Sequence, residues 1–286
     1  MIYLTSNFSE IVAYRITGEF VKKITVEELS EKVNINHRYI NFKHWKENLF
    51  CANVNLSGKE QCRFFIFTLE GEIVKLFQNY VFFNSRGNFP IPFMEGGLYC
   101  YNDDFFYKQG YSDTLFRVSD QLELKAEAVF EVPGNKISEN IRYQISYKDF
   151  TYIQVISVFE NYIWMRKSNS TGIYLYAKKN NHLISFASDP FLQKILPLPD
   201  GTMRAFALDG LRNDIDGGLP FIPNGQIQNG QQMVCVYQSY LLKEKLTEEH
   251  FARYDIKDPE AHKRLRTLLT NLDWEDNPVL MIATFK

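Results

Sequence analysis

The segment Arg63–Phe77, RFFIFTLEGEIVKLF, contains two apolar runs separated by a short polar turn at Glu70-Gly71. The same arrangement recurs at 10–24 (EIVAYRITGEFVKKI), 113–130 (DTLFRVSDQLELKAEAVF) and 172–186 (GIYLYAKKNNHLISF). Each copy is typical of two antiparallel strands joined by a hairpin turn. The copies recur roughly every 50 to 60 residues, a period that indicates a propeller or another array.

Two further strands precede the hairpin in each central copy, which gives a four-stranded unit. The expected strands are 39–45, 49–54, 63–68 and 72–77; then 89–94, 98–102, 114–118 and 124–132; then 152–159, 162–167, 172–177 and 182–186. Apolar and polar residues alternate along many of them, as in sheets that pack face to face. We therefore predict an all-β chain, a β-propeller of four-stranded antiparallel blades.

The two ends of the chain depart from this unit. The first unit is incomplete, with strands expected at 2–5, 10–16 and 20–24, and the fifth has strands at 219–227 and 233–238. A small helical insert at about 241–273 follows, with Asp258 as N-cap and Pro259 at the first helical position. A strand at 279–285 then closes the fold. We expect one domain, 1–286, with units of about 1–38, 39–87, 88–150, 151–203 and 204–286. We interpret it as a six-bladed type with five units visible; the alternative is a natural five-bladed ring.

Composition excludes several partners. The net charge of −2 and the isoelectric point of about 6.2 do not indicate the excess of basic residues that is typical of nucleic-acid-binding proteins. No apolar run reaches the roughly 18 residues needed to span a bilayer, and no secretion signal follows Met1. The four cysteines form no CxxC pair and are expected to be small buried hydrophobes.

Two kinds of segment are candidates for a site. Asn213-Asp214-Ile215-Asp216-Gly217-Gly218 resembles the start of a calcium loop, but no third acid follows, so a tight turn is favoured. His250 and His262 fall in the helical insert and are expected to be solvated. We expect neither a metal nor another cofactor.

Aromatic rings crowd the segment around Asn102-Asp103-Asp104 and could stack on a sugar or peptide; the alternative is that they fill the space between sheets. Arginines near strand ends could add anion binding. The resulting candidate ligand-binding residues are Tyr101, Asp103, Tyr107, Arg142, Arg166, Arg212, Asp214 and Asp216.

Three segments carry a family resemblance: Tyr111–Gln121, Asn213–Pro223 and Asp276–Lys286. Over essentially its whole length the chain resembles six-bladed β-propeller proteins of unknown function from gut-type Gram-negative bacteria, which are distantly similar to NHL-repeat propellers. Members usually begin with a lipoprotein or secretion signal and an opening blade, which are not visible here. If the native N-terminus lies upstream, the resemblance implies a location in the cell envelope or outside the cell. Ile222 stands where an aromatic residue is more typical.

Two functions are compatible with these features. The first is a non-catalytic binding or scaffolding module for a carbohydrate, a peptide or another protein, since propellers gather loops around a rigid scaffold. The second is a lyase or hydrolase that works in the central channel with converging titratable groups. The sequence favours the first, because no nucleophile signature or phosphate loop is present.

Overall fold

The computed structural model describes residues 1–6, 10–35, 40–54, 60–80, 82, 96–109, 112–131, 153–167, 173–186, 193–197, 203–207, 210–221, 225–227 and 232–284. The chain divides into two compact units, Met1–Gln154 and Val155–Lys286.

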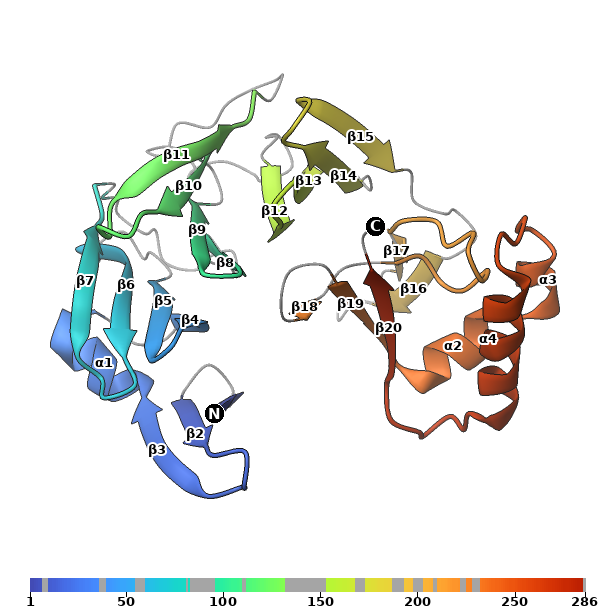
Figure 1. Ribbon diagram of the computed structural model, residues 1–286, viewed down its shortest axis with the longest axis horizontal. Coiled ribbons are helices and arrows are strands. Elements are labelled where there is room, and N and C mark those ends of the chain that lie inside the picture. Colours follow the sequence, from blue (N-terminus) through green and yellow to red (C-terminus); the bar gives the residue numbers. More distant parts are fainter. Residues whose placement is uncertain are drawn as a thin grey trace. The chain divides into compact units, whose positions relative to one another are not determined.

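The first unit contains three antiparallel sheets (Figure 1). Their strands are β1 (Ile2–Ser6), β2 (Glu10–Tyr14) and β3 (Phe20–Thr25); β4 (Ile40–Lys46), β5 (Leu49–Val54), β6 (Cys62–Thr68) and β7 (Ile73–Gln78); and β8 (Gly96–Tyr101), β9 (Asp104–Gln109), β10 (Thr114–Val118) and β11 (Leu124–Val129). In every sheet the strands pair in sequence order, so each sheet is a simple meander.

The middle strands β5, β6 and β9 are buried on both faces, and β6 shows this most clearly. Its Phe65 and Phe67 pack with β1–β3, while Phe64 and Ile66 pack with β9 and β10. Consecutive side chains of a strand point to opposite faces, so a strand between two neighbouring sheets must be apolar throughout. This explains the unbroken apolar run Phe64–Phe67 (FFIF).

A helix that the sequence analysis did not assign follows β3. Helix α1 (Val26–Val33) begins at a capping box, in which the Thr25 hydroxyl accepts from the Glu28 amide and the Glu28 carboxylate accepts from the Thr25 amide. It ends at Asn34, which adopts a left-handed conformation with φ of 51°. Leu29 is fully buried with the core of the first two sheets.

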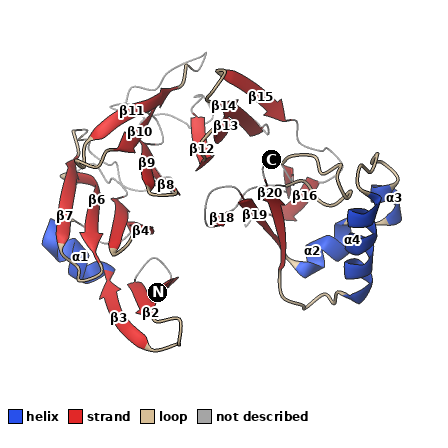
Figure 2. Ribbon diagram, in the orientation of Figure 1, coloured by secondary structure: helices blue, strands red, loops and turns tan. Residues whose placement is uncertain are grey.

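The second unit combines antiparallel sheets with a group of helices (Figure 2). Its strands are β12 (Ile153–Val158), β13 (Tyr162–Lys167), β14 (Ile173–Ala177) and β15 (His182–Phe186); β16 (Gln193–Pro197) and β17 (Met203–Ala207); and β18 (Gly225–Ile227), β19 (Gln232–Tyr237) and β20 (Val279–Thr284). The helices are α2 (Ser239–Lys245), α3 (Glu248–Phe251) and α4 (Pro259–Asn271). Strand β12 begins two residues before the division between the units.

The all-β prediction of four-stranded antiparallel blades is confirmed in fold class. The expected strands around 39–77 and 152–186 agree with β4–β7 and β12–β15 to within one or two residues. The closing strand pairs with β19, with Val234 opposite Ile282, so it is part of a sheet and lies at the edge of the order β18–β19–β20. Asp258 caps α4 through its side chain, which accepts from the Ala261 amide at 2.9 Å.

Other details differ from the sequence interpretation. The third unit contains β9, which was not expected, and the strand expected at 89–94 lies outside the described residues. The pair β16–β17 was also not expected. Cys51, Cys62 and Cys235 are buried free thiols as predicted, and Cys100 is partly exposed.

Candidate functional site

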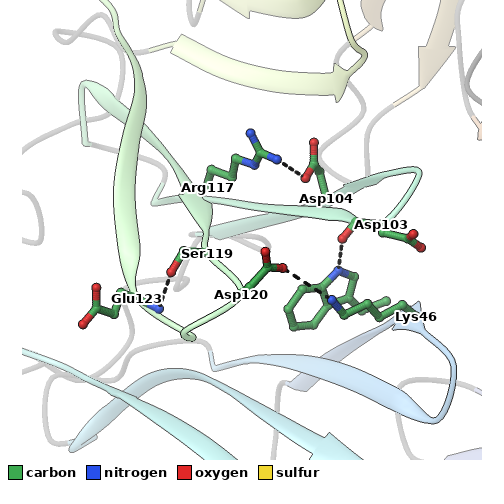
Figure 3. Close-up of polar contacts among 8 residues, drawn as sticks. Lys46, Asp103, Asp104, Arg117, Ser119, Asp120 and Glu123 are labelled. Carbon is green, nitrogen blue, oxygen red and sulfur yellow. Dashed lines mark hydrogen bonds and ion pairs between the residues drawn. The ribbon is translucent and has the colours of Figure 1, made fainter.

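Three turns of the first unit come together beside β4 and present charged side chains. The β4–β5 turn follows Lys46, the β8–β9 turn contains Asp103, and the β10–β11 turn contains Asp120. Asp104 and Arg117 lie on the adjoining strands. We call Lys46, Asp103, Asp104, Arg117 and Asp120 the carboxylate edge (Figure 3).

The edge is supported from the core by a tryptophan. Trp45 is only 5% exposed, and its indole Nε1–H donates to the backbone carbonyl of Asp103 at 2.7 Å. Its ring lies against Phe105, with 5.4 Å between the ring centres. Asn102 adopts a left-handed φ of 50°, which asparagine tolerates better than most residues. The β8–β9 turn is therefore fixed from below while its side chains stay outside.

Positive and negative groups alternate along the edge. Arg117 forms an ion pair and hydrogen bond with Asp104 (Figure 3). The Lys46 ammonium lies 3.8 Å from the Asp120 carboxylate and 4.6 Å from the centre of the Trp45 ring. The Asp120 side chain is 91% exposed, so this pair contributes little to stability. Carboxylate acceptors and cationic donors thus face solvent side by side.

The two predicted tyrosines of this region belong to the core. Tyr107 is 2% exposed, and its ring lies 4.4 Å from that of Phe64 between two sheets. Tyr101 is 6% exposed at the end of β8. Both rings are therefore buried, and that of Tyr107 fills space between sheets, which was the alternative interpretation. Asp103 is the predicted residue of this segment that faces solvent.

The second acidic segment is an ordered loop, which we call the Asn213 loop and define as residues 211–221. Backbone hydrogen bonds between Leu211 and Phe221, 2.8 and 2.9 Å long, close its ends. Inside it, the Asp216 carboxylate accepts from the Asn213 side chain at 2.6 Å and from the Gly218 amide at 2.8 Å. This is the tight turn that the sequence favoured over a calcium loop.

Two histidines hold the Asn213 loop against the helices, contrary to the expectation that they are solvated. His250 is 3% exposed, and its Nε2–H donates to the Gly217 carbonyl at 2.9 Å. His262 donates from Nδ1 to the Asp216 carbonyl at 2.7 Å. Both acceptors are carbonyl oxygens, which fixes the protonated nitrogen of each ring.

The remaining charges of the loop also have partners in the fold. Asp214 forms an ion pair of 2.5 Å with Lys257, and this hydrogen bond lowers the pKa of the Asp214 carboxyl. Arg212 donates to the Arg253 carbonyl at 3.2 Å, and its guanidinium lies 4.8 Å from the centre of the Tyr254 ring. The Asn213 loop is thus fastened to the helical region by every predicted residue it contains.

The two other predicted arginines belong to neither segment in sequence. Arg166 lies on β13 and is half-buried, and Arg142 lies outside the described residues. The structure therefore brings together Arg212, Asp214 and Asp216 in the Asn213 loop, whereas Asp103 lies in the carboxylate edge. Within the described ranges, no group of three or more His, Cys, Asp or Glu side chains is arranged to hold a metal ion.

Sequence reasoning missed Trp45, Lys46 and Arg117. A tryptophan followed by a lysine at a predicted hairpin turn was a visible signal for Trp45 and Lys46. Nothing in the sequence marked their approach to Asp103, because Trp45 and Asp103 are 58 positions apart.

Comparison with known proteins gives a family and a structural neighbour. No curated protein matches the chain. A crystal structure of a protein from Bacteroides fragilis, described as a "putative exported protein", matches with a TM-score of 0.58 and 14% identity over 100% of this chain and 77% of that one. At this identity the match shows the fold alone. None of the helices in the described part of the chain has the length and apolar character needed to cross a bilayer. Residues 1–284 match the model of the domain of unknown function DUF4934, and the chain belongs to that family.

Proposed function

We propose that this chain is a non-catalytic binding module whose carboxylate edge recognises a carbohydrate. A peptide is the other ligand class compatible with an edge of mixed charge. The observation that carries the proposal is the alternation of exposed acceptors, Asp103 and Asp120, with the cationic donors Lys46 and Arg117. Sugar hydroxyls both donate and accept hydrogen bonds, so such an edge suits them.

The support beneath the edge strengthens this proposal. Binding residues work best when rigid elements hold them, because less conformational entropy is then lost on binding. Trp45 fixes the β8–β9 turn, and the buried strands β5, β6 and β9 hold the turns in register. Exposed charges on a fixed base are therefore expected to bind weakly but with a defined geometry.

A ligand screen tests the proposal. The purified chain is titrated by calorimetry with maltotriose, cellotriose, chitotriose and a mixed-charge pentapeptide, and the same sugars are supplied as chromogenic glycosides. We expect weak binding of at least one oligosaccharide without turnover. If the pentapeptide binds and none of the oligosaccharides does, the ligand class is a peptide and not a carbohydrate.

The competing hypothesis of a lyase or hydrolase predicts a different result in this screen, which is turnover of a chromogenic glycoside. Measurable turnover that a single acid-to-amide substitution abolishes would overturn the binding proposal. Glycoside hydrolysis requires two carboxyl groups at a set separation, so one substitution should suffice to remove it.

We further propose that the repeats belong to one six-bladed, NHL-like propeller domain over 1–286, with the helical region as an insert. The recurring four-stranded meander supports this arrangement. The description of the structural neighbour as exported supports a location in the cell envelope or outside the cell. A crystal structure with a different blade number, or fractionation that recovers the native protein in the cytoplasm, would contradict these points.

A further inference from the structure

A β-bulge in β6 turns Arg63 toward the third sheet. The pairing of β6 with β7 skips Arg63, since Cys62 is opposite Gln78 and Phe64 opposite Phe77. Cys62 packs with the first two sheets, whereas Phe64 packs toward the third. The extra residue lies where the buried face changes, and bulges commonly re-aim side chains beside functional sites.

Arg63 reaches a buried glutamine at the end of β9 opposite to the carboxylate edge. The guanidinium Nη1–H donates to Gln109 Oε1 at 2.6 Å. Because a guanidinium can only donate, this contact fixes the orientation of the amide. Gln109 is 1% exposed, and among the described residues its buried Nε2 has no hydrogen-bond partner. A buried N–H₂ group without an acceptor is costly, so its retention calls for an explanation.

The strand ends beside Arg63 are polar and reach solvent on one side. Asn79 is fully buried and donates from Nδ2 to the carbonyl of Glu60, itself a buried carboxylate residue. Next to Asn79, Tyr80 is 73% exposed, with its ring centre 5.9 Å from the Arg63 guanidinium. Half-buried Arg63 therefore connects the unpaired amide with an exposed aromatic ring.

We propose that Gln109 Nε2 and the Arg63 guanidinium form a binding site for the carboxylate group of a ligand, separate from the carboxylate edge. The Gln109 amide supplies a donor that the fold leaves unused, and the guanidinium beside it supplies the positive charge that attracts a carboxylate. Tyr80 offers an exposed ring face beside the charge. A free organic acid or the uronate of an acidic sugar would present the same group.

Titration of the intact chain with acetate, glucuronate and glucose tests this site. Chemical shifts of a sample with ¹⁵N-labelled glutamine report on the Gln109 side chain directly. We expect glucuronate to bind at least about tenfold more tightly than glucose and to shift the Gln109 side-chain signal. Comparable shifts with acetate would identify a free carboxylate as sufficient, and shifts with glucuronate alone would identify the acidic sugar.

A near-isosteric substitution separates ligand binding from folding. Gln109→Glu keeps an acceptor for Arg63 but removes the unpaired donor and adds a charge that repels the ligand. We expect an unchanged or higher melting temperature and a loss of glucuronate binding of at least about tenfold. Lys75→Gln, which removes an exposed charge on β7 away from the bulge, is the matched control and should bind normally.

Three results would overturn the proposal. These are equal affinity for glucose and glucuronate, undiminished binding by Gln109→Glu, and no shift of the Gln109 side chain with any of the three probes. Gln109→Met covers the case in which Gln109→Glu fails to fold, because it removes the unpaired donor without adding charge. It should also lose glucuronate binding.

Discussion

The two Asn-Asp turns of this chain, Asn102–Asp104 and Asn213–Asp216, are similar in sequence and differ in what their carboxylates contact. In the first turn, Asp103 faces solvent while a tryptophan holds its backbone from below. In the second, Asp214 and Asp216 are bound by Lys257, Asn213 and the Gly218 amide. An acidic turn therefore indicates a ligand site only when the fold leaves its oxygens unused.

The same contrast separates two of the three family motifs, Asn213–Pro223 and Asp276–Lys286, from the proposed site. The third, Tyr111–Gln121, contains Arg117 and Asp120 of the carboxylate edge. Asn213, in one motif, approaches the sulfur of Met281, in another, at 3.8 Å. The Ser239 hydroxyl donates to the carbonyls of Asp276 and Asn277 at 2.9 and 2.7 Å. These two motifs thus fasten the last sheet, the helices and the Asn213 loop together.

The largest expected effect is the loss of the Asp216 carboxylate. Asp216→Ala leaves the Gly218 amide and the Asn213 side chain without their acceptor inside a packed loop, which should cost about 3 kcal/mol in the free energy of unfolding. Asp103→Ala, at the exposed turn, should change it by less than about 0.5 kcal/mol. Urea denaturation of both variants measures the difference, and equal losses would remove the distinction between the turns.

A backbone substitution sharpens the comparison. Gly217 has φ of +77°, and a Cβ there would lie 2.5 Å from Cδ1 of Ile256, so Gly217→Ala should cost about 2 kcal/mol. Gly18 has φ of +88° with open space around it, so Gly18→Ala should cost about 1 kcal/mol from the backbone alone. A greater loss at Gly18 than at Gly217 in urea denaturation would argue against tight packing of the Asn213 loop.

The two units also contain a matched pair of histidines. His250→Phe removes a buried hydrogen bond to the Gly217 carbonyl and should cost about 1.5 kcal/mol. His44 makes a similar contact of 3.0 Å with the Glu47 carbonyl, but it is exposed, so His44→Phe should cost less than about 0.5 kcal/mol. Thermal unfolding of the two variants checks this order, and the reverse order would show that the loop does not depend on His250.

The smallest effect is a dependence on pH. Lys257 holds the pKa of Asp214 below its unfolded value, so the ion pair stabilises the fold above about pH 4. This stability is lost as pH falls through the folded pKa, and it is under about 1 kcal/mol because the side chain is partly exposed. Asp214→Asn should flatten the acid side of the stability profile measured in urea, and an unchanged profile would contradict this.

The pattern of apolar runs and turn residues in the sequence predicted most of the sheets but missed one strand of the first unit. The hairpins around Arg63–Phe77 and 172–186 follow from apolar runs bounded by turn residues. Strand β9 was overlooked because its rings at 105–107 were weighed as ligand contacts or filling between sheets and not as a strand. Asn102-Asp103 between two aromatic runs is itself a hairpin signal, and it agrees with the observed pairing of Tyr101 with Asp104.

The candidate site was harder to predict from the sequence, because contacts between residues far apart in the sequence determine which acidic side chains stay exposed. His250 and His262 contact Gly217 and Asp216, which lie 33 and 46 positions earlier in the sequence. Lys257, the partner of Asp214, is also far from it in the sequence. Without those contacts, Asp214 and Asp216 were as plausible as Asp103. Their side chains were correctly identified as turn-formers, but which acids remain exposed depends on tertiary packing.

Titration of Asp103→Asn and Asp214→Asn with whichever of maltotriose, cellotriose and chitotriose binds the unmodified chain tests the central claim most directly. Each variant loses one negative charge at an Asn-Asp turn. We predict that Asp103→Asn weakens binding about tenfold while Asp214→Asn leaves it unchanged. Undiminished affinity of Asp103→Asn, or an equal loss in both variants, would contradict the assignment of the carboxylate edge as the binding site.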